Sequence, residues 1–357
     1  MLHRDLIRVV CAVGLGVTMF VAGYALVTAE DVPAASTMSD VYHVPRDYAT
    51  IQAAVNAADE GGIIQVSAGV YRESVVITTS GLRLHGSAGV VIEGAGTGVG
   101  IFVGSGGLGT PGPPVTDVEI SGVEVRGFER GILVNLGSLI TIHNNDVHDI
   151  RNVGSVTAGD GTGIEFWTTT DSEVTQNFVH ENGEGGIYLR LGSTRNTIRG
   201  NRVHENGDPL RLPSGGSTRG TGILLTGVGT NHNDVLENEI LRNYDRGILI
   251  VRPAGPNPAT GNLVAQNRIQ ESQRSGIAIM GSAAGNFVYQ NDARGNNLSG
   301  LPPCYQCNLN DMSTPGIGGN SWEHNLGTFN LIDDCLVIPT ARLITSGRPT
   351  PRAFSSR

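Results

Sequence analysis

Residues 174–189 read VTQNFVHENGEGGIYL, and this stretch contains two short phrases that recur along most of the chain. The first phrase is an apolar residue, two variable positions, Asn, one variable position and usually an aliphatic residue. Its copies begin at Ile142, Val174, Ile198, Val235, Val264 and Val288, and a last copy begins at Trp322. The second phrase is Gly-Ile, and its copies begin at Gly131, Gly163, Gly186, Gly222, Gly247 and Gly276.

The shortest intervals between copies, Asn177 to Asn201 and Asn267 to Asn291, are both 24 residues long. A fixed period of this size indicates stacked units, each of which buries its apolar face against its neighbours. Segments such as Ile187–Arg190 alternate strictly, as half-buried strands do, and no repeat has the apolar spacing of a helix. We therefore predict an all-β solenoid with three short strands in each coil.

Each repeated Asn is expected at a corner of its coil, where its side chain can hydrogen-bond to the turn backbone. Stacked strands lie about 4.8 Å apart, so successive asparagines can bond to one another and satisfy polar groups that the stack buries. We interpret the set as a structural ladder and not as catalytic groups. The ladder consists of Asn145, Asn177, Asn201, Asn238, Asn267 and Asn291.

The phrases NFVHEN…GGIYL and NRVHEN…TGILL resemble the repeats of right-handed parallel β-helix proteins of the pectate-lyase-like superfamily. The segment Ala49–Ile77 is similar to the amino-terminal cap of these proteins. Residues with the spacing of a short capping helix are Ile51, Ala54, Val55 and Ala58. The resemblance covers most of Val44–Asn330. It implies a right-handed parallel β-helix of about 24 residues per coil, in a superfamily with many activities, including polysaccharide lyases and alginate C5-epimerases.

The two ends of the chain differ in composition from the repeats. Residues 1–29 are predicted to be a signal peptide, or an uncleaved membrane anchor, because basic residues precede a long apolar run that ends in small residues. Residues 30–43 are expected to be a linker, residues 44–335 the β-helix, and residues 336–357 a disordered tail. The protein is therefore expected to be a secreted, periplasmic or cell-surface monomer.

Cleavage after residue 29 would leave three cysteines, Cys304, Cys307 and Cys335. The Cys304-x-x-Cys307 pair could bind a metal or act in redox chemistry, but no second pair and no histidine in zinc spacing accompanies it. We favour one disulfide that ties down the carboxy-terminal loop, with Cys335 as a candidate partner.

All 24 basic residues are arginine, and the formal net charge is -9. The lack of lysine excludes Schiff-base chemistry, a P-loop lysine and a lysine base. The negative charge argues against a nucleic-acid partner, whereas local arginines could still hold an anionic polysaccharide. No spaced Asp/Asn calcium loop occurs, so no cofactor is expected, although carboxylates could recruit calcium.

If each Ile of the Gly-Ile phrases points into the core, alternate residues after it point outward in two columns. The first column contains Leu133, Glu165, Tyr188, Leu224, Leu249 and Ala278; the second contains Asn135, Trp167, Arg190, Thr226, Val251 and Met280. On two neighbouring coils, four of these side chains are expected to share one solvent-exposed face: Glu165, Trp167, Tyr188 and Arg190. Aromatic rings stack on sugars and arginine binds carboxylates, so this face is a candidate carbohydrate site, with ordinary cross-strand packing as the alternative.

A third column contains His148, His180 and His204, each followed by an acidic residue. Three imidazoles could bind a metal or supply a general base, but neighbours on flat strands converge poorly on one ion. We therefore predict a half-exposed ladder of histidines and acids, and no metal site. A single histidine could still act in catalysis.

Two coils carry extra residues at the same corner, at 151–162 and 207–221, and the coil between them is short there. Loops on a rigid scaffold often carry function, so these two are predicted to form walls over the coil of Tyr188 and Arg190. A third insertion, 252–261, falls at a different corner.

If the protein is an enzyme, two chemistries fit. In uronate elimination or C5 epimerisation, Arg190 would neutralise the sugar carboxylate, Tyr188 would be the acid or base, and His180 the alternative base. Glycoside hydrolysis would instead use paired carboxylates. The candidate catalytic residues are Arg190, Tyr188, Glu165 and His180, and the candidate substrate-binding residues are Trp167, Tyr188, Arg190, Asp160 and Glu184.

The Asp-Pro-His motif of alginate epimerases does not occur in the chain, nor does the paired-Asp pattern of polygalacturonases. A non-catalytic carbohydrate-binding or cell-envelope protein is therefore a hypothesis of nearly equal weight. In that case Trp167 and Tyr188 would be a stacking platform for sugar rings.

Overall fold

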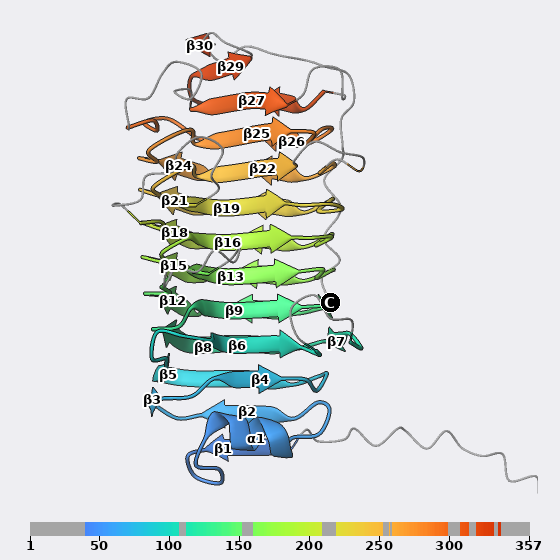
Figure 1. Cartoon of the computed structure of the whole chain (residues 1–357), viewed down its shortest axis with the longest axis vertical. Coiled ribbons are helices and arrows are strands. Elements are labelled where there is room, and N and C mark those ends of the chain that lie inside the picture. The colour runs from blue at the N-terminus through green and yellow to red at the C-terminus, as the bar shows by residue number, and fades with distance from the viewer. Residues whose placement is uncertain are drawn as a thin grey trace, which may run out of the picture. The chain divides into compact units, whose positions relative to one another are not determined.

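The structure is a computed structural model (Figure 1). It describes residues 40–106, 112–151, 160–208, 219–252, 257, 259–298, 308–313, 319–331 and 335–336. All of these belong to one compact unit, in which short parallel strands stack coil upon coil. Within the described ranges, no helix is long and apolar enough to cross a membrane.

One large sheet runs along the stack. The first coils contribute β1 (Val41–Val44), β2 (Ile63–Val66), β3 (Gly69–Tyr71), β5 (Arg83–Glu93) and β8 (Glu119–Arg126). Later coils each contribute two short strands separated by a corner. The first of each pair is β11 (Thr141–His143), β14 (Glu173–Thr175), β17 (Thr197–Arg199), β20 (Asp234–Leu236), β23 (Leu263–Ala265), β26 (Phe287–Tyr289) or β28 (Ser321–Glu323). The second is β12 (Asp146–His148), β15 (Phe178–His180), β18 (Arg202–His204), β21 (Glu239–Leu241) or β24 (Arg268–Gln270).

A second sheet forms another face of the same coils. It contains β4 (Val75–Ile77), β6 (Val99–Gly104), β9 (Arg130–Asn135), β13 (Thr162–Trp167), β16 (Gly185–Arg190), β19 (Thr221–Thr226), β22 (Ile248–Arg252), β25 (Ile277–Gly281), β27 (Leu309–Ser313), β29 (Phe329–Leu331) and β30 (Cys335–Leu336). Successive strands pair in parallel, except that β29 and β30 are antiparallel. A small separate ribbon pairs β7 (Val115–Thr116) with β10 (Gly137–Ser138). The predicted all-β coil architecture is thus confirmed.

The register follows the Gly-Ile phrases, as the sequence predicts. In the second sheet the isoleucines pair in one column that is fully buried in the core: Ile132, Ile164, Ile187, Ile223, Ile248 and Ile277. Because strand side chains alternate, this column fixes which neighbours point away from the core.

The predicted asparagine ladder is confirmed at every step from Asn145 to Asn291. At each step, one Asn donates both its backbone N–H and its side-chain Nδ2–H to Oδ1 of the Asn on the next coil. Between Asn177 and Asn201 these distances are 2.9 and 3.0 Å. The second Nδ2 hydrogen of Asn177 bonds to the Ile142 carbonyl, so both donors and both acceptor positions of the amide are used.

Two further ladders flank the predicted one, at positions five residues before and five residues after it, as Asn196 and Asn206 flank Asn201. The earlier ladder contains Ser172, Asn196, Asn233, Asn262, Asn286 and Asn320. The later ladder contains Asn182, Asn206 and Asn243. In all three ladders the residue before a ladder position often has a positive φ. Gly200, directly before Asn201, has a φ of 66°, which glycine adopts readily because it has no Cβ.

Helix α1 (Ile51–Ala57) covers the first coils, as predicted (Figure 1). The Thr50 hydroxyl accepts a hydrogen bond from the Ala53 N–H, which caps the first turn. The carboxylate of Glu73 accepts two more, from the Ile51 and Gln52 N–H groups at 2.9 and 2.8 Å. These bonds satisfy amides that a helix start leaves without partners.

Several predictions about the ends of the chain lie outside the described residues. These include the signal or anchor over 1–29, the pair Cys304 and Cys307, and the tail beyond 336. Cys335 belongs to β30. The expected linker is too long by a few residues, because β1 begins at Val41 and pairs with β2.

Removing one ladder amide tests its contribution to stability. Asn201→Ala should lower the free energy of unfolding by about 3 kcal/mol, because it leaves the N–H and Nδ2 donors of Asn177 buried without an acceptor. Asn56→Ala is the control, since Asn56 is exposed on helix α1 and should tolerate the change. Urea unfolding of both variants measures the difference. Equal stabilities would contradict the ladder's role.

Candidate functional site

The outward columns of the second sheet have the register that the sequence predicts. Glu165 pairs with Tyr188 and Trp167 pairs with Arg190, on strands β13 and β16. The expected solvent exposure is wrong, because Glu165, Tyr188 and Arg190 are 1, 0 and 8% exposed. Trp167 is half-buried. Strand β16 is therefore buried on both faces.

A second apolar cluster explains part of this burial. Tyr188 packs with its column neighbours Leu224, Leu249 and Ala278, separately from the main core. The outward column is apolar on these coils, so exposure would place a large apolar patch in water. The predicted solvent exposure is wrong because a side chain that points away from the main core can still be buried, here in the second apolar cluster.

Five charged side chains form a buried alternating chain beside this cluster. Arg130 joins Asp160 and Glu165, each at 2.8 Å. Arg190 Nε lies 2.5 Å from Glu165 Oε1, and Arg190 Nη2 lies 3.4 Å from Glu184 Oε1. Buried carboxylates need such partners, because an isolated charge is costly to remove from water. The site residues Asp160, Glu165, Glu184 and Arg190 are thus brought together.

Sequence reasoning missed Arg130, which links two of the carboxylates. Its only signal was its position directly before Gly131-Ile132, on the coil preceding Glu165. Arg246 holds the same position before Gly247-Ile248 and pairs with the buried Asp245 at 2.5 Å. Burial raises the pKa of Asp245, against the nearby arginines, which lower it.

Tyr188 is held as a hydrogen-bond donor. Its hydroxyl donates to the Glu184 carbonyl at 3.0 Å, and the Arg190 guanidinium lies 4.9 Å from its ring centre. Burial, and next the charge of Glu184, raise the pKa of Tyr188 well above its usual value. The ring lies over Gly185, where any Cβ would collide with it. The tyrosine therefore stays protonated at neutral pH.

Two neighbouring side-chain N–H donors beside the charged chain have no hydrogen-bond partner in the described part of the structure. They are Trp167 Nε1 and Asn135 Nδ2, both buried. Asn135 and Trp167 are direct neighbours in register, and the Arg130 guanidinium lies 6.0 Å from the Trp167 ring centre. Buried donors without partners are uncommon, so this pair is a candidate contact for a ligand.

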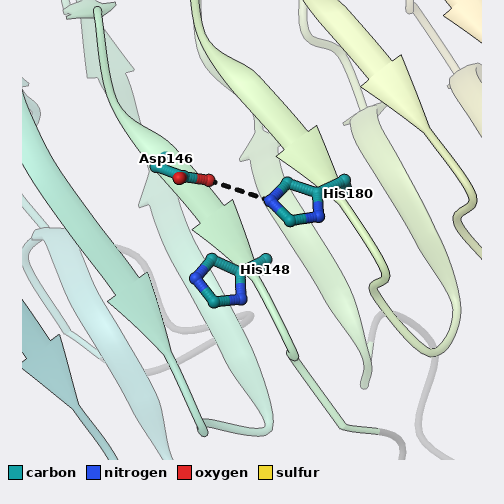
Figure 2. Close-up of side chains that lie close together, drawn as sticks. All are labelled: Asp146, His148 and His180. Carbon is teal, nitrogen blue, oxygen red and sulfur yellow. Dashed lines mark hydrogen bonds and ion pairs between the residues drawn. The ribbon is translucent and has the colours of Figure 1, made fainter.

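His180 does not join this group. It lies on β15 in the large sheet, where it stacks between His148 and Phe178 with ring centres 4.8 and 3.9 Å away. Its Nε2 meets Asp146 Oδ1 at 3.1 Å, as Figure 2 shows. No contact within the described ranges links it to Arg190, so the placement of His180 as the base beside Arg190 is not supported.

The predicted column of histidines and acids is present, but it is not half-exposed, because the side chains of His148, His180 and His204 are 14, 17 and 7% exposed. His148, His180 and His204 pair in register, and His148 meets Glu124 and Asp149 at 3.2 and 3.0 Å. His204 is more buried than the other two, and this burial, followed by the charge of Arg202, lowers its pKa. It therefore favours the neutral form.

The three insertions are only partly visible. Residues 152–159, 209–218, 253–256 and 258 lie outside the described residues, so the predicted walls over Tyr188 and Arg190 stay a prediction.

Comparison with known families identifies the fold. The family described as right handed beta helix region matches residues 71–293, more than half of the chain. The chain belongs to this family. The predicted right-handed parallel β-helix is confirmed. No curated protein matches the sequence of this β-helix protein.

Several solved structures have a similar fold. The A-module of a mannuronan C-5 epimerase from Azotobacter vinelandii is 14% identical with a TM-score of 0.54, over 81% of this chain and 95% of that one. DFA-IIIase from Arthrobacter chlorophenolicus without its lid is 17% identical with a TM-score of 0.51, over 83% and 91%. Dettilon tailspike protein is 14% identical with a TM-score of 0.58, over 80% and 62%. These likenesses establish the shared fold.

The buried charged chain should be more important for stability than exposed ion pairs. Glu165→Gln should lower the free energy of unfolding by about 3 kcal/mol, because Arg130 and Arg190 would lose a shared buried partner. Glu237→Gln breaks an exposed pair with Arg199 and should cost less than about 1 kcal/mol. Thermal and urea unfolding test this contrast. Equal losses in the two variants would argue against the network's importance.

Proposed function

We propose that this β-helix protein binds polysaccharide around Trp167, on the outward side of β9, β13 and β16. The observation that carries the proposal is the pair of buried donors without partners, Trp167 Nε1 and Asn135 Nδ2. A sugar hydroxyl that displaces the side chains covering these two atoms accepts from both, while the half-buried indole offers an apolar face to the sugar ring.

The buried charged side chains hold the surroundings of Trp167 in place. Arg130 lies near the Trp167 ring and is fixed by Asp160 and Glu165. A side chain locked by such contacts loses little freedom when a ligand binds, so a rigid platform favours affinity.

The net charge of the five buried charged side chains favours neutral sugar units over uronates. Three carboxylates, from Asp160, Glu165 and Glu184, surround the two guanidinium groups. Arg190 is already paired with two of them, and a uronate carboxylate at that position would meet like charge. Export from the cell is part of the proposal, resting on the apolar residues near the start of the chain.

Substitution of Trp167 tests the binding site. Trp167→Ala should weaken binding to a recognised polymer by about tenfold, because ring stacking and a hydrogen bond are lost. Tyr289→Ala is the matched control, since Tyr289 is 36% exposed on β26 of the large sheet. Affinity electrophoresis in gels of glucan, fructan, mannan, alginate or pectin gives the measurement. Failure of the intact protein to bind any of these polymers would contradict the proposal.

Uronate elimination or C5 epimerisation is the second candidate. The observation in its favour is that Tyr188, Arg190 and Glu165 lie together on adjacent strands. Its geometry would require Arg190 to exchange a protein carboxylate for that of the substrate.

This second candidate is tested with alginate, pectin and glucuronan as substrates. Elimination would produce ultraviolet absorbance of unsaturated uronates, and epimerisation would change the proton spectrum of the polymer. Arg190→Ala should then abolish the reaction, while Arg199→Ala should retain it, because the Arg199 side chain is 41% exposed and lies on β17 of the other sheet. Circular dichroism must show that both variants are folded. No change in any uronate polymer excludes this candidate.

A further inference from the structure

Asp146, His148 and His180 form a cluster that the proposed polysaccharide function does not use (Figure 2). One ligand atom from each side chain lies within 4.8 Å of the other two. We infer that this cluster is a binding site for one divalent transition-metal ion, such as zinc. The site lies on the large sheet, and the inference is independent of polysaccharide binding.

The placement of the three residues follows from strand geometry. Asp146 and His148 are two positions apart on β12, so they project from the same face of the sheet. His180 pairs directly with His148 from the neighbouring strand β15. Two residues of one strand and one of the next strand form a triangle, which can occupy one side of an ion and leave the opposite side open.

The ligand types fit a transition metal. Two imidazoles and one carboxylate suit zinc, iron, cobalt or nickel, whereas calcium and magnesium prefer oxygen atoms alone. Bonds of about 2.1 Å to a tetrahedral ion separate the ligand atoms by about 3.4 Å. Asp146 Oδ1 and His180 Nε2 are already 3.1 Å apart. The side chains of His148 and His180 keep 14 and 17% exposure, so they have access to solvent and to an ion.

Each imidazole also has a carboxylate near its other nitrogen. His148 Nδ1 lies 3.0 Å from Asp149, and His180 Nδ1 lies 3.7 Å from Glu181. A carboxylate that accepts from Nδ1 leaves Nε2 free to bind a metal and increases its basicity. Asp149 is therefore placed to orient His148, whereas Glu181 lies beyond hydrogen-bond distance of His180.

The rings need one adjustment to share an ion. They are stacked nearly parallel, with an angle of 14° between their planes. For both Nε2 atoms to bind one ion, the rings must leave this arrangement and His148 must give up its contact with Glu124.

The third histidine of the column is excluded from the site. The ring of Phe178 stacks on His180 and meets His204 edge-on, with ring centres 5.6 Å apart in the second contact. His204 is also more deeply buried. Asp146 therefore completes the triad in place of a third imidazole.

The same sheet provides a matched control cluster. His85 and His143 both bond to one oxygen of Glu119, at 3.0 Å each, across the strand that carries it. These two histidines lie on either side of Ser121 in register, so they are two strands apart. They are half-buried like the candidate ligands, but within the described ranges they and Glu119 are not among the groups whose ligand atoms lie close enough to hold one metal ion.

Zinc titration of the metal-stripped full chain by calorimetry tests the inference. We expect one zinc ion per chain. His180→Gln and Asp146→Asn should each lower the association constant by at least about tenfold, since even partners of metal ligands contribute that much. His143→Gln should leave it unchanged. Gln and Asn keep the size and polarity of the native groups, and thermal unfolding without metal checks the fold of each variant.

Cobalt provides a spectroscopic readout that a purely structural role would not affect. The cobalt-loaded chain should show visible bands of a four- or five-coordinate ion with nitrogen and oxygen ligands, and His180→Gln should remove them. A thiolate-to-cobalt band would assign the ion to the cysteines and overturn the inference. So would an absence of zinc uptake, or equal losses of affinity in His180→Gln and His143→Gln.

Discussion

The structure depends on one repeated interaction, the stacking of buried asparagine amides from coil to coil. Each amide links the next Asn to the backbone of the preceding coil, as Asn201 does with Asn238 and the Val174 carbonyl. A short parallel coil leaves corner N–H and carbonyl groups that water cannot reach, and each must find a partner. The ladders satisfy these groups and fix the register of every coil.

Because the register is fixed, the position of a residue in the sequence determines which residues of the neighbouring coils lie beside it. The backbone at Glu165, Tyr188 and Leu224 is equivalent, yet these side chains make an ionic contact, a hydrogen bond and an apolar contact. Function in such a scaffold depends on which side chains neighbouring coils place side by side. This explains how one sheet carries a buried charged chain while another carries the triad of Asp146, His148 and His180.

The repeats of the sequence predicted much of this, because the registers of strands and corners are local. The ladder, the outward columns and helix α1 follow from phrases a few residues long. The flanking ladders were also readable, since Asn233, Asn238 and Asn243 repeat the five-residue spacing of the preceding coil. The burial of Tyr188 and the ion pair of Arg130 with Glu165 could not be predicted from the sequence. They depend on contacts between residues far apart in the sequence and on what covers the sheet.

Exchange of the asparagine side-chain amide protons, followed by nuclear magnetic resonance, tests the central role of the ladders most directly. The Nδ2 protons of Asn177, Asn201 and Asn238 should exchange only when the coils open, and far more slowly than those of the exposed Asn56. Exchange of the ladder amides at the rate of Asn56 would show that these bonds do not hold the stack, and would contradict the account.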